Sequence, residues 1–185
     1  MSAGCYDELV GGVSVTIPRR LVEELERRGI DVGSAFIDLA SIVLNLDPQV
    51  IAEAHLELAL KYLEEGKSLV DRDSVQASEK LYKAAEEVVK ALTVHFNLES
   101  VLRDVERSGR WSVAKLEEAV EAISERIGEW FRHSWDSAWV LHVWGFHEAK
   151  LNSKAVKLRL PDVEKMVSEA REVVKKQGEK TGVSR

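Results

Sequence analysis

Hydrophobic and polar residues alternate in two different ways in the first quarter of the chain. Residues 13–17 (Val-Ser-Val-Thr-Ile) alternate with a period of two, which is typical of a half-buried strand, and Pro18 ends the run. Residues 19–28 and 31–46 follow a helical spacing, with Gly29 placed to end the first helix. We therefore predict an N-terminal arm over residues 1–47, built from one strand and two helices.

From residue 48 onward, apolar positions keep the spacings of three and four that place side chains on one helix face. Asp47-Pro48 is a start signal, because Asp caps free N–H groups and Pro is tolerated in the first turn. The helices predicted from these spacings cover residues 48–65, 74–96, 98–106, 113–130, 135–151 and 161–176. The stripe of the second of these helices comprises Ser78, Leu81, Ala85, Val88, Leu92 and Phe96.

These elements define the fold class. We expect an all-α protein: an up-down bundle of four or five helices over residues 48–176, with the arm before it and a flexible polar tail, residues 177–185, after it. The composition agrees, because only three Pro and eleven Gly in 185 residues favour long helices. The regular stripe over residues 113–130 is typical of a seam within an antiparallel bundle or a dimer.

Charge and cysteine content narrow the function classes. A net charge of −6 argues against a uniformly basic surface, so a nucleic-acid partner would need a local basic patch. The single cysteine, Cys5, excludes an intrachain disulfide and a zinc cluster of several thiolates, and it fits a reducing cytoplasm. No apolar stretch is long enough to span a bilayer, and residues 1–12 lack the signal-peptide pattern. We expect a cytoplasmic protein with no membrane partner and no cofactor; its many Glu, Lys and Arg residues are typical of thermophile proteins.

Two segments resemble a known family. Residues 77–92 (Ala-Ser-Glu-Lys-Leu-Tyr-Lys-Ala-Ala-Glu-Glu-Val-Val-Lys-Ala-Leu) resemble the second helix of the HEPN superfamily, where small residues and a Lys-Ala-Leu ending recur. Residues 139–148 (Trp-Val-Leu-His-Val-Trp-Gly-Phe-His-Glu), followed by Pro161-Asp162-Val163, resemble the archaeal PaREP group of HEPN-like proteins. The resemblance covers about residues 48–176. It implies a helical bundle that forms a homodimer through its long helices, with a nucleotidyltransferase-type protein as a candidate partner.

Arg126 and His133 are the candidate catalytic residues. Nuclease-type HEPN proteins use an Arg and a His separated by four to six residues, which meet across a dimer and cleave RNA without a metal. If one unbroken helix carries both residues, they lie on nearly the same face, roughly 10 Å apart. His133 would then act as general acid or base while Arg126 stabilises the phosphate. The alternative is a solvated Arg and a His near a helix end.

Aromatic and charged residues near this pair form a candidate ligand site. Five tryptophans fall between residues 111 and 144; such a cluster is either core or a base-stacking pocket for RNA or a nucleotide. The candidate ligand-binding residues are Trp130, Arg132, Trp135, His147, Glu148, Lys150 and Lys154. His147 and Glu148 would face a ligand or a second subunit, and the lysines would contact phosphate or remain solvated.

No metal site is expected at His142 and His147. Five residues on an α-helix place two side chains about 140° apart, whereas zinc enzymes use a spacing of four. We interpret His142 as a core residue between Trp139 and Phe146, and His55 as a residue at the core edge.

The strand-helix-helix order of the arm also resembles ribbon-helix-helix DNA-binding proteins. In that family the strand pairs with its twin and enters the major groove, so Ser14 and Thr16 would face the bases. Strand-exchange dimerisation or capping of the bundle are the other uses of the arm.

The function predicted from the sequence is therefore a HEPN-like homodimeric binding module for a nucleotide, RNA or a partner protein. The first alternative is a metal-independent endoribonuclease of toxin type that uses Arg126 and His133. The second is a ribbon-helix-helix antitoxin or regulator.

Overall fold

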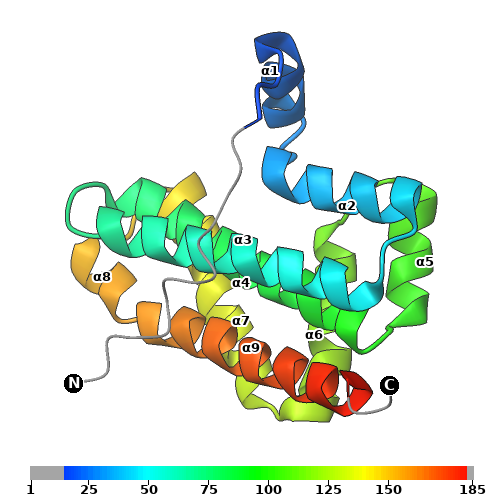
Figure 1. Cartoon of the computed structure of the whole chain (residues 1–185). Coiled ribbons are helices and arrows are strands. Elements are labelled where there is room, and N and C mark those ends of the chain that lie inside the picture. Colours follow the sequence, from blue (N-terminus) through cyan, green and yellow to red (C-terminus); the bar gives the residue numbers. More distant parts are fainter. Residues whose placement is uncertain (1–14, 183–185) are drawn as a thin grey trace.

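The computed structural model describes residues 15–182, which form a helical bundle without strands (Figure 1). This confirms the predicted all-α class. The elements are α1 (Arg19–Arg27), α2 (Val32–Leu44), α3 (Pro48–Leu69), α4 (Ser74–His95), α5 (Glu99–Ser108), α6 (Val113–Ile127), α7 (Trp130–Val140), the π-helix η1 (Leu141–His147), α8 (Ser153–Lys157) and α9 (Leu160–Gly182).

α4 lies at the centre of the bundle. It pairs with α3 in a helical hairpin, and α6, α7, η1 and α9 also pack against it (Figure 1). The predicted stripe of α4 is buried, with Phe96 only partly so, but burial also reaches the flanks of the helix. The flanking residues with no exposed surface are Ala77, Ala84, Val89, Ala91 and Thr93. α4 is therefore covered on more sides than a surface helix with one apolar stripe.

Asp47 and Pro48 begin α3 as predicted, and Asp47 Oδ1 accepts a hydrogen bond of 2.8 Å from the Gln49 N–H. The predicted end of this helix at Gly66 is wrong, since α3 continues to Leu69. A Cβ atom at position 66 would lie 2.8 Å from the Leu81 side chain. Gly66 therefore serves the close approach of α3 to α4, not the end of a helix.

Two predicted helices in the C-terminal half of the chain, residues 113–130 and 135–151, have different boundaries in the structure. The helix predicted over residues 113–130 ends at Ile127, because Gly128 adopts a φ of 108° that helical residues do not have. The helix predicted over residues 135–151 begins earlier, at Trp130, and changes into η1 at Leu141. The last helix runs to Gly182, past the predicted start of the polar tail at residue 177.

The arm has its two predicted helices and lacks the predicted strand in the part that is described. Residues 15–18 have no regular structure, and Val13 and Ser14 lie outside the described residues. A strand needs a partner to satisfy its N–H and C=O groups, and residues 15–182 contain no strand that could pair with this segment. α1 projects from the bundle, and α2 runs alongside α3 (Figure 1). Across residues 15–182, no helix combines the length and apolar character that crossing a membrane requires.

Candidate functional site

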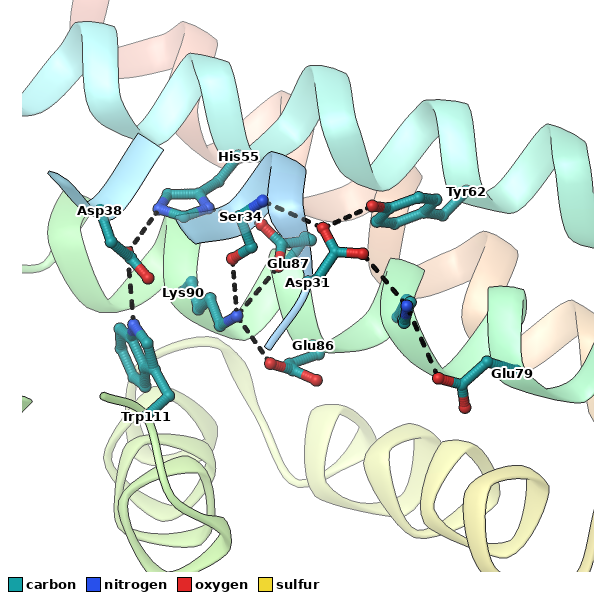
Figure 2. Close-up of polar contacts among 11 residues, drawn as sticks. Asp31, Ser34, Asp38, His55, Tyr62, Glu79, Glu86, Glu87, Lys90 and Trp111 are labelled. Atoms are coloured by element: carbon teal, nitrogen blue, oxygen red, sulfur yellow. Dashed lines mark hydrogen bonds and ion pairs between the residues drawn. The ribbon is translucent and has the colours of Figure 1, made fainter. Parts of the chain in front are cut away.

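The helix α2 is oriented with its polar stripe toward the bundle. Asp31, Ser34, Asp38 and Ser41 follow spacings of three and four, so they share one face of the helix. Figure 2 shows Asp31, Ser34 and Asp38 directed at side chains of α3 and α4. Charged hydrogen bonds therefore help to hold α2 against the bundle.

Asp31 joins three helices through one carboxylate. As the N-cap of α2, its Oδ1 accepts the Ser34 N–H at 3.0 Å, and it also accepts the Tyr62 hydroxyl of α3 at 2.6 Å. Its Oδ2 accepts from Lys83 of α4 at 3.1 Å. Partial burial raises the pKa of Asp31, but these hydrogen bonds and the Lys83 charge outweigh it, so the pKa lies below its ordinary value.

A buried ion-pair cluster lies next to Asp31, where His55 of α3 meets Glu87 and Lys90 of α4 (Figure 2). His55 Nδ1 lies 2.6 Å from Glu87 Oε2, and both side chains are almost fully buried. Lys90 Nζ donates to Glu87 Oε1 at 3.0 Å and to Ser34 Oγ at 2.8 Å, and it forms an ion pair of 2.6 Å with Glu86. The cluster thus links α2, α3 and α4.

The charges of this cluster offset the cost of burying them. Burial raises the pKa of Glu87, but the Lys90 charge and the His55 hydrogen bond lower it by a larger amount. The pKa of Glu87 therefore lies below its ordinary value. Burial lowers the pKa of Lys90, and Glu86 and Glu87 raise it by more, so the net pKa lies above the ordinary value. Glu87 and Lys90 are therefore both charged at neutral pH.

Asp38 lies at the edge of the cluster, and its contacts do not offset the cost of burying its charge. Its Oδ1 is 3.6 Å from His55 Nε2 and accepts a long hydrogen bond of 3.4 Å from the Trp111 indole. The burial of Asp38 has the largest effect on its pKa and raises it, in spite of the nearby charge of Lys90. A cleft of about 290 Å³ beside Asp38, Lys90 and Trp111 separates α2 from the turn between α5 and α6.

The opposite face of α2 is apolar and exposed. Phe36, Leu39 and Val43 form a stripe with spacings of three and four, and they are 68%, 61% and 75% exposed. Ile42 and Leu44 flank the stripe and are also more than half exposed. These five residues are called the α2 apolar face below. Eight of the eleven large exposed hydrophobic residues in the described part of the chain lie in residues 15–50, so the apolar surface is concentrated on the arm.

The structure places the two candidate catalytic residues on different helices. Arg126 is exposed at the end of α6, where it donates to the Ala122 carbonyl at 2.6 Å and lies over the Phe96 ring. His133 is exposed on α7 and accepts from Arg132 at 3.2 Å. The break at Gly128 removes the unbroken helix on which their common face was predicted.

The aromatic candidates divide into core and surface. Trp135 has no exposed surface, and its indole donates to Glu117 at 2.8 Å, so it belongs to the core of the chain and offers no stacking face. Trp130 is partly buried; its indole donates to the Ile127 carbonyl at 2.7 Å and Lys165 lies over its ring. Arg132 is exposed and pairs with Asp136 at 3.6 Å.

The remaining candidate ligand-binding residues lie at the end of η1 and in the segment after it. His147, Glu148, Lys150 and Lys154 are all exposed, the first at the end of η1 and the last on α8. His142 packs between Tyr82, Trp139 and Phe146, as predicted for a core residue, but its side chain is 21% exposed, so it lies at the edge of the core. The predicted separation of His142 from His147 is wrong, because their Nε2 atoms lie 3.1 Å apart. The angle of 140° holds for an α-helix, and these residues lie on a π-helix.

Sequence reasoning missed the residues that hold α2. His55 was predicted at the core edge and is 1% exposed, while Glu87 and Lys90 gave no signal apart from their place in the segment that resembles HEPN proteins. The polar spacing of Asp31, Ser34, Asp38 and Ser41 was available in the sequence. It indicates which face of α2 is polar, but only the charged partners on α3 and α4 show that this face is the inner one.

Comparisons with known proteins agree with the bundle. The archaeal PaREP1/PaREP8 family matches residues 54–167. A crystal structure of a Sulfolobus solfataricus protein is 41% identical, with a TM-score of 0.59, over 62% of this chain and 94% of that one. A solution structure of the same structural-genomics target is 42% identical, with a TM-score of 0.54, over 60% of this chain and 87% of that one. Among curated proteins, none matches this chain.

The family segment begins within α3 and ends within α9, so α1 and α2 lie outside it. His55, Glu87 and Lys90 lie inside the segment, whereas Asp31, Ser34 and Asp38 do not. The bundle that matches the family therefore supplies the buried charges, and the arm supplies the groups that bind to them.

Proposed function

This chain belongs to the archaeal PaREP1/PaREP8 family, and from that starting point we propose that it is a homodimeric interaction module. In the proposed dimer, the α2 apolar face of one copy packs on the same face of a second copy. The observation that carries the proposal is the orientation of α2, whose polar stripe is bound to α3 and α4 and whose apolar stripe faces outward.

Burial of the exposed apolar side chains of α2 would stabilise the proposed dimer. Removing half of the surface of five such side chains from water contributes about 4–7 kcal/mol per copy. Two copies together then contribute about 8–14 kcal/mol, which is comparable to the cost of association, about 4–15 kcal/mol. Leu21 of α1 and Val50 of α3 are further large apolar side chains that are about half exposed, and a stable interface buries roughly 800 Å² per partner.

The charge pattern favours a second copy as the occupant. The only charged residue within α2 is Asp38, and it is directed into the bundle. An apolar face without charges is complementary to itself, so two copies related by a two-fold axis meet without like-charge repulsion. The same lack of basic residues makes the face unsuitable for a phosphate backbone.

Nucleotide or RNA binding by the tryptophan cluster has less support. Trp135 is buried, and Arg126 and Arg132 are already engaged by hydrogen bonds or ion pairs within their own helices. The proposed module therefore binds protein, and its first partner is its own second copy.

Light scattering after gel filtration tests the proposal. The wild-type protein is expected at twice the chain mass of 20.8 kDa. Phe36→Asp and Val43→Asp each place a charge on the exposed stripe of the face, so each is expected to shift the mass to one chain without lowering helix content. Leu158→Asp is the matched control, since Leu158 is 71% exposed but lies at the end of α8. A wild-type mass of one chain, or a dimer that both α2 variants retain, would overturn the proposal.

A further inference from the structure

The π-helix η1 brings together two histidines that an α-helix would separate. In a π-helix the backbone hydrogen bonds join residues five apart, so side chains five apart lie nearly above one another. The bond from the Glu148 N–H to the Val143 carbonyl, 2.9 Å long, has this spacing. His142 and His147 are also five apart, and their Nε2 atoms face each other at 3.1 Å with the rings at 83°.

The environment of His142 favours a proton on Nδ1 and a lone pair on Nε2. Among the described residues, His142 Nδ1 and Glu79 Oε2 are both buried without a hydrogen-bond partner, and they lie 3.6 Å from each other. If Nδ1 carries the proton and directs it at Glu79 Oε2, the two unpaired atoms become partners of each other. It leaves the lone pair on Nε2, directed at His147. A carboxylate behind a histidine is the usual arrangement that orients a metal-binding imidazole.

Neighbouring residues hold the His142 ring in place. The Tyr82 ring stacks on it, with centroids 4.0 Å apart. Gly145 lies so close to α4 that a Cβ atom there would be 2.3 Å from Ser78 Oγ, which fixes the depth of η1 against α4. His147 is exposed and His142 is about one fifth exposed, so an ion from solvent can reach both Nε2 atoms.

We propose that His142 and His147 bind one first-row transition-metal ion through their Nε2 atoms, with Glu79 as the positioning residue. Two nitrogen ligands of a tetrahedral Zn²⁺, each about 2.0–2.1 Å from the ion, are about 3.3 Å apart, close to the observed separation. Imidazole nitrogen suits Zn²⁺, Cu²⁺ and Ni²⁺. Within residues 15–182, no third His, Cys, Asp or Glu joins the pair to form a ligand cluster. The remaining coordination positions are therefore open to water or to an exogenous ligand, whereas a structural zinc site fills all four positions with protein side chains.

The test is calorimetric titration of the full chain, free of a histidine tag, with Zn²⁺. The wild type is expected to bind one ion per chain. His147→Ala removes a ligand from an exposed position without opening a core cavity, and affinity is expected to fall by more than about tenfold. Glu79→Gln is expected to weaken binding by about 10–100-fold, the usual effect of losing the group that orients a ligand. His95→Gln is the matched control, because His95 lies at the opposite end of α4 from Glu79.

Cu²⁺ gives a readout that a change in folding would not imitate. Electron paramagnetic resonance of the Cu²⁺-loaded wild type is expected to show coupling to two imidazole nitrogens, and that of His147→Ala coupling to one. Absence of Zn²⁺ binding by the wild type, or equal binding by His147→Ala, would overturn the proposal. An unchanged Cu²⁺ spectrum in that variant would do the same.

Discussion

Lys90 of α4 donates a hydrogen bond of 2.8 Å to Ser34 of α2, although the two residues are 56 positions apart in the chain. This bond, together with those of Asp31, determines which face of α2 is turned inward. The inner face is the polar one, so Phe36, Leu39 and Val43 on the other face remain in contact with water, with the exposed Ile42 and Leu44 at the flanks. The proposed dimer follows from that orientation.

Glu87→Gln is expected to destabilise the protein. The substitution keeps the volume of the side chain but removes the charge that faces Lys90 and His55 in the buried cluster. Hydrogen bonds to charged groups contribute about 1.5–3 kcal/mol each, and the free energy of unfolding is expected to fall by about that amount. Urea unfolding at pH 7 measures it; an unchanged midpoint would show that the cluster does not stabilise the fold.

Asp38→Asn is expected to stabilise the protein slightly, whereas Glu87→Gln destabilises it. Because burial raises the pKa of Asp38, the folded state favours its neutral form, and the charged form costs stability at pH 7. A neutral Asn of similar shape removes this cost and still accepts the Trp111 hydrogen bond. The free energy of unfolding is therefore expected to rise slightly in urea unfolding at pH 7. A fall as large as that of Glu87→Gln would instead show that the Asp38 charge stabilises the fold.

The acid sensitivity of the fold is expected to depend on Glu87. Its pKa is lowered by folding, so its stabilising contribution is complete above the ordinary value of 4.5 and is lost as the pH falls through the lower folded value. Glu87→Gln has no such group, so its free energy of unfolding is expected to depend less on pH below about 4.5 than that of the wild type. Equal slopes in urea unfolding at several pH values would refute this role.

Gly145→Ala is expected to destabilise the contact between η1 and α4. The added Cβ would lie 2.5 Å from Ser78 Cβ, and overpacking of this kind costs about 1–3 kcal/mol. Ser78→Gly removes the obstructing atoms, so the double variant is expected to lose less stability than the two single variants together. Strict additivity in thermal unfolding would show that the two residues do not compete for space.

Cleavage of RNA by this chain is not expected. Gly128 ends α6 between Arg126 and His133, and each side chain is bonded within its own helix. Purified protein in EDTA is expected to leave mixed single-stranded and structured RNA intact, and Arg126→Ala and His133→Ala are expected to behave like the wild type. Cleavage by the wild type that both folded variants lose would instead favour the endoribonuclease.

The periodicity of the sequence predicted much of the bundle. The stripe of Ser78, Leu81, Ala85, Val88 and Leu92 is buried, and Asp47-Pro48 begins α3, because both depend on local spacing and local hydrogen bonds. The predicted end of α3 at Gly66 failed because close packing against Leu81, a tertiary contact, explains that glycine.

The candidate sites were less predictable for a related reason. Glu87 is 32 positions from His55, and such charges resemble a solvated helix surface until the pairing is known. The predicted angle between His142 and His147 holds for an α-helix. These residues form a π-helix, in which residues five apart are joined by a hydrogen bond and their side chains lie on the same side. Helical periodicity assigns a face to each residue, but it does not show which face a neighbouring helix covers.

The distance between equivalent residues of two copies tests pairing through α2 without relying on a change in mass. Spin labels attached at Leu44→Cys, in a Cys5→Ser background that removes the only native cysteine, would lie at the end of α2. α2 is about 20 Å long and packed helices lie about 8–10 Å apart, so pairing of the α2 faces predicts a label distance below about 40 Å. The distance at Leu44 should be shorter than that between labels at Leu158→Cys. The absence of dipolar coupling at Leu44, or a shorter distance at Leu158, would show that the two copies do not pair through α2.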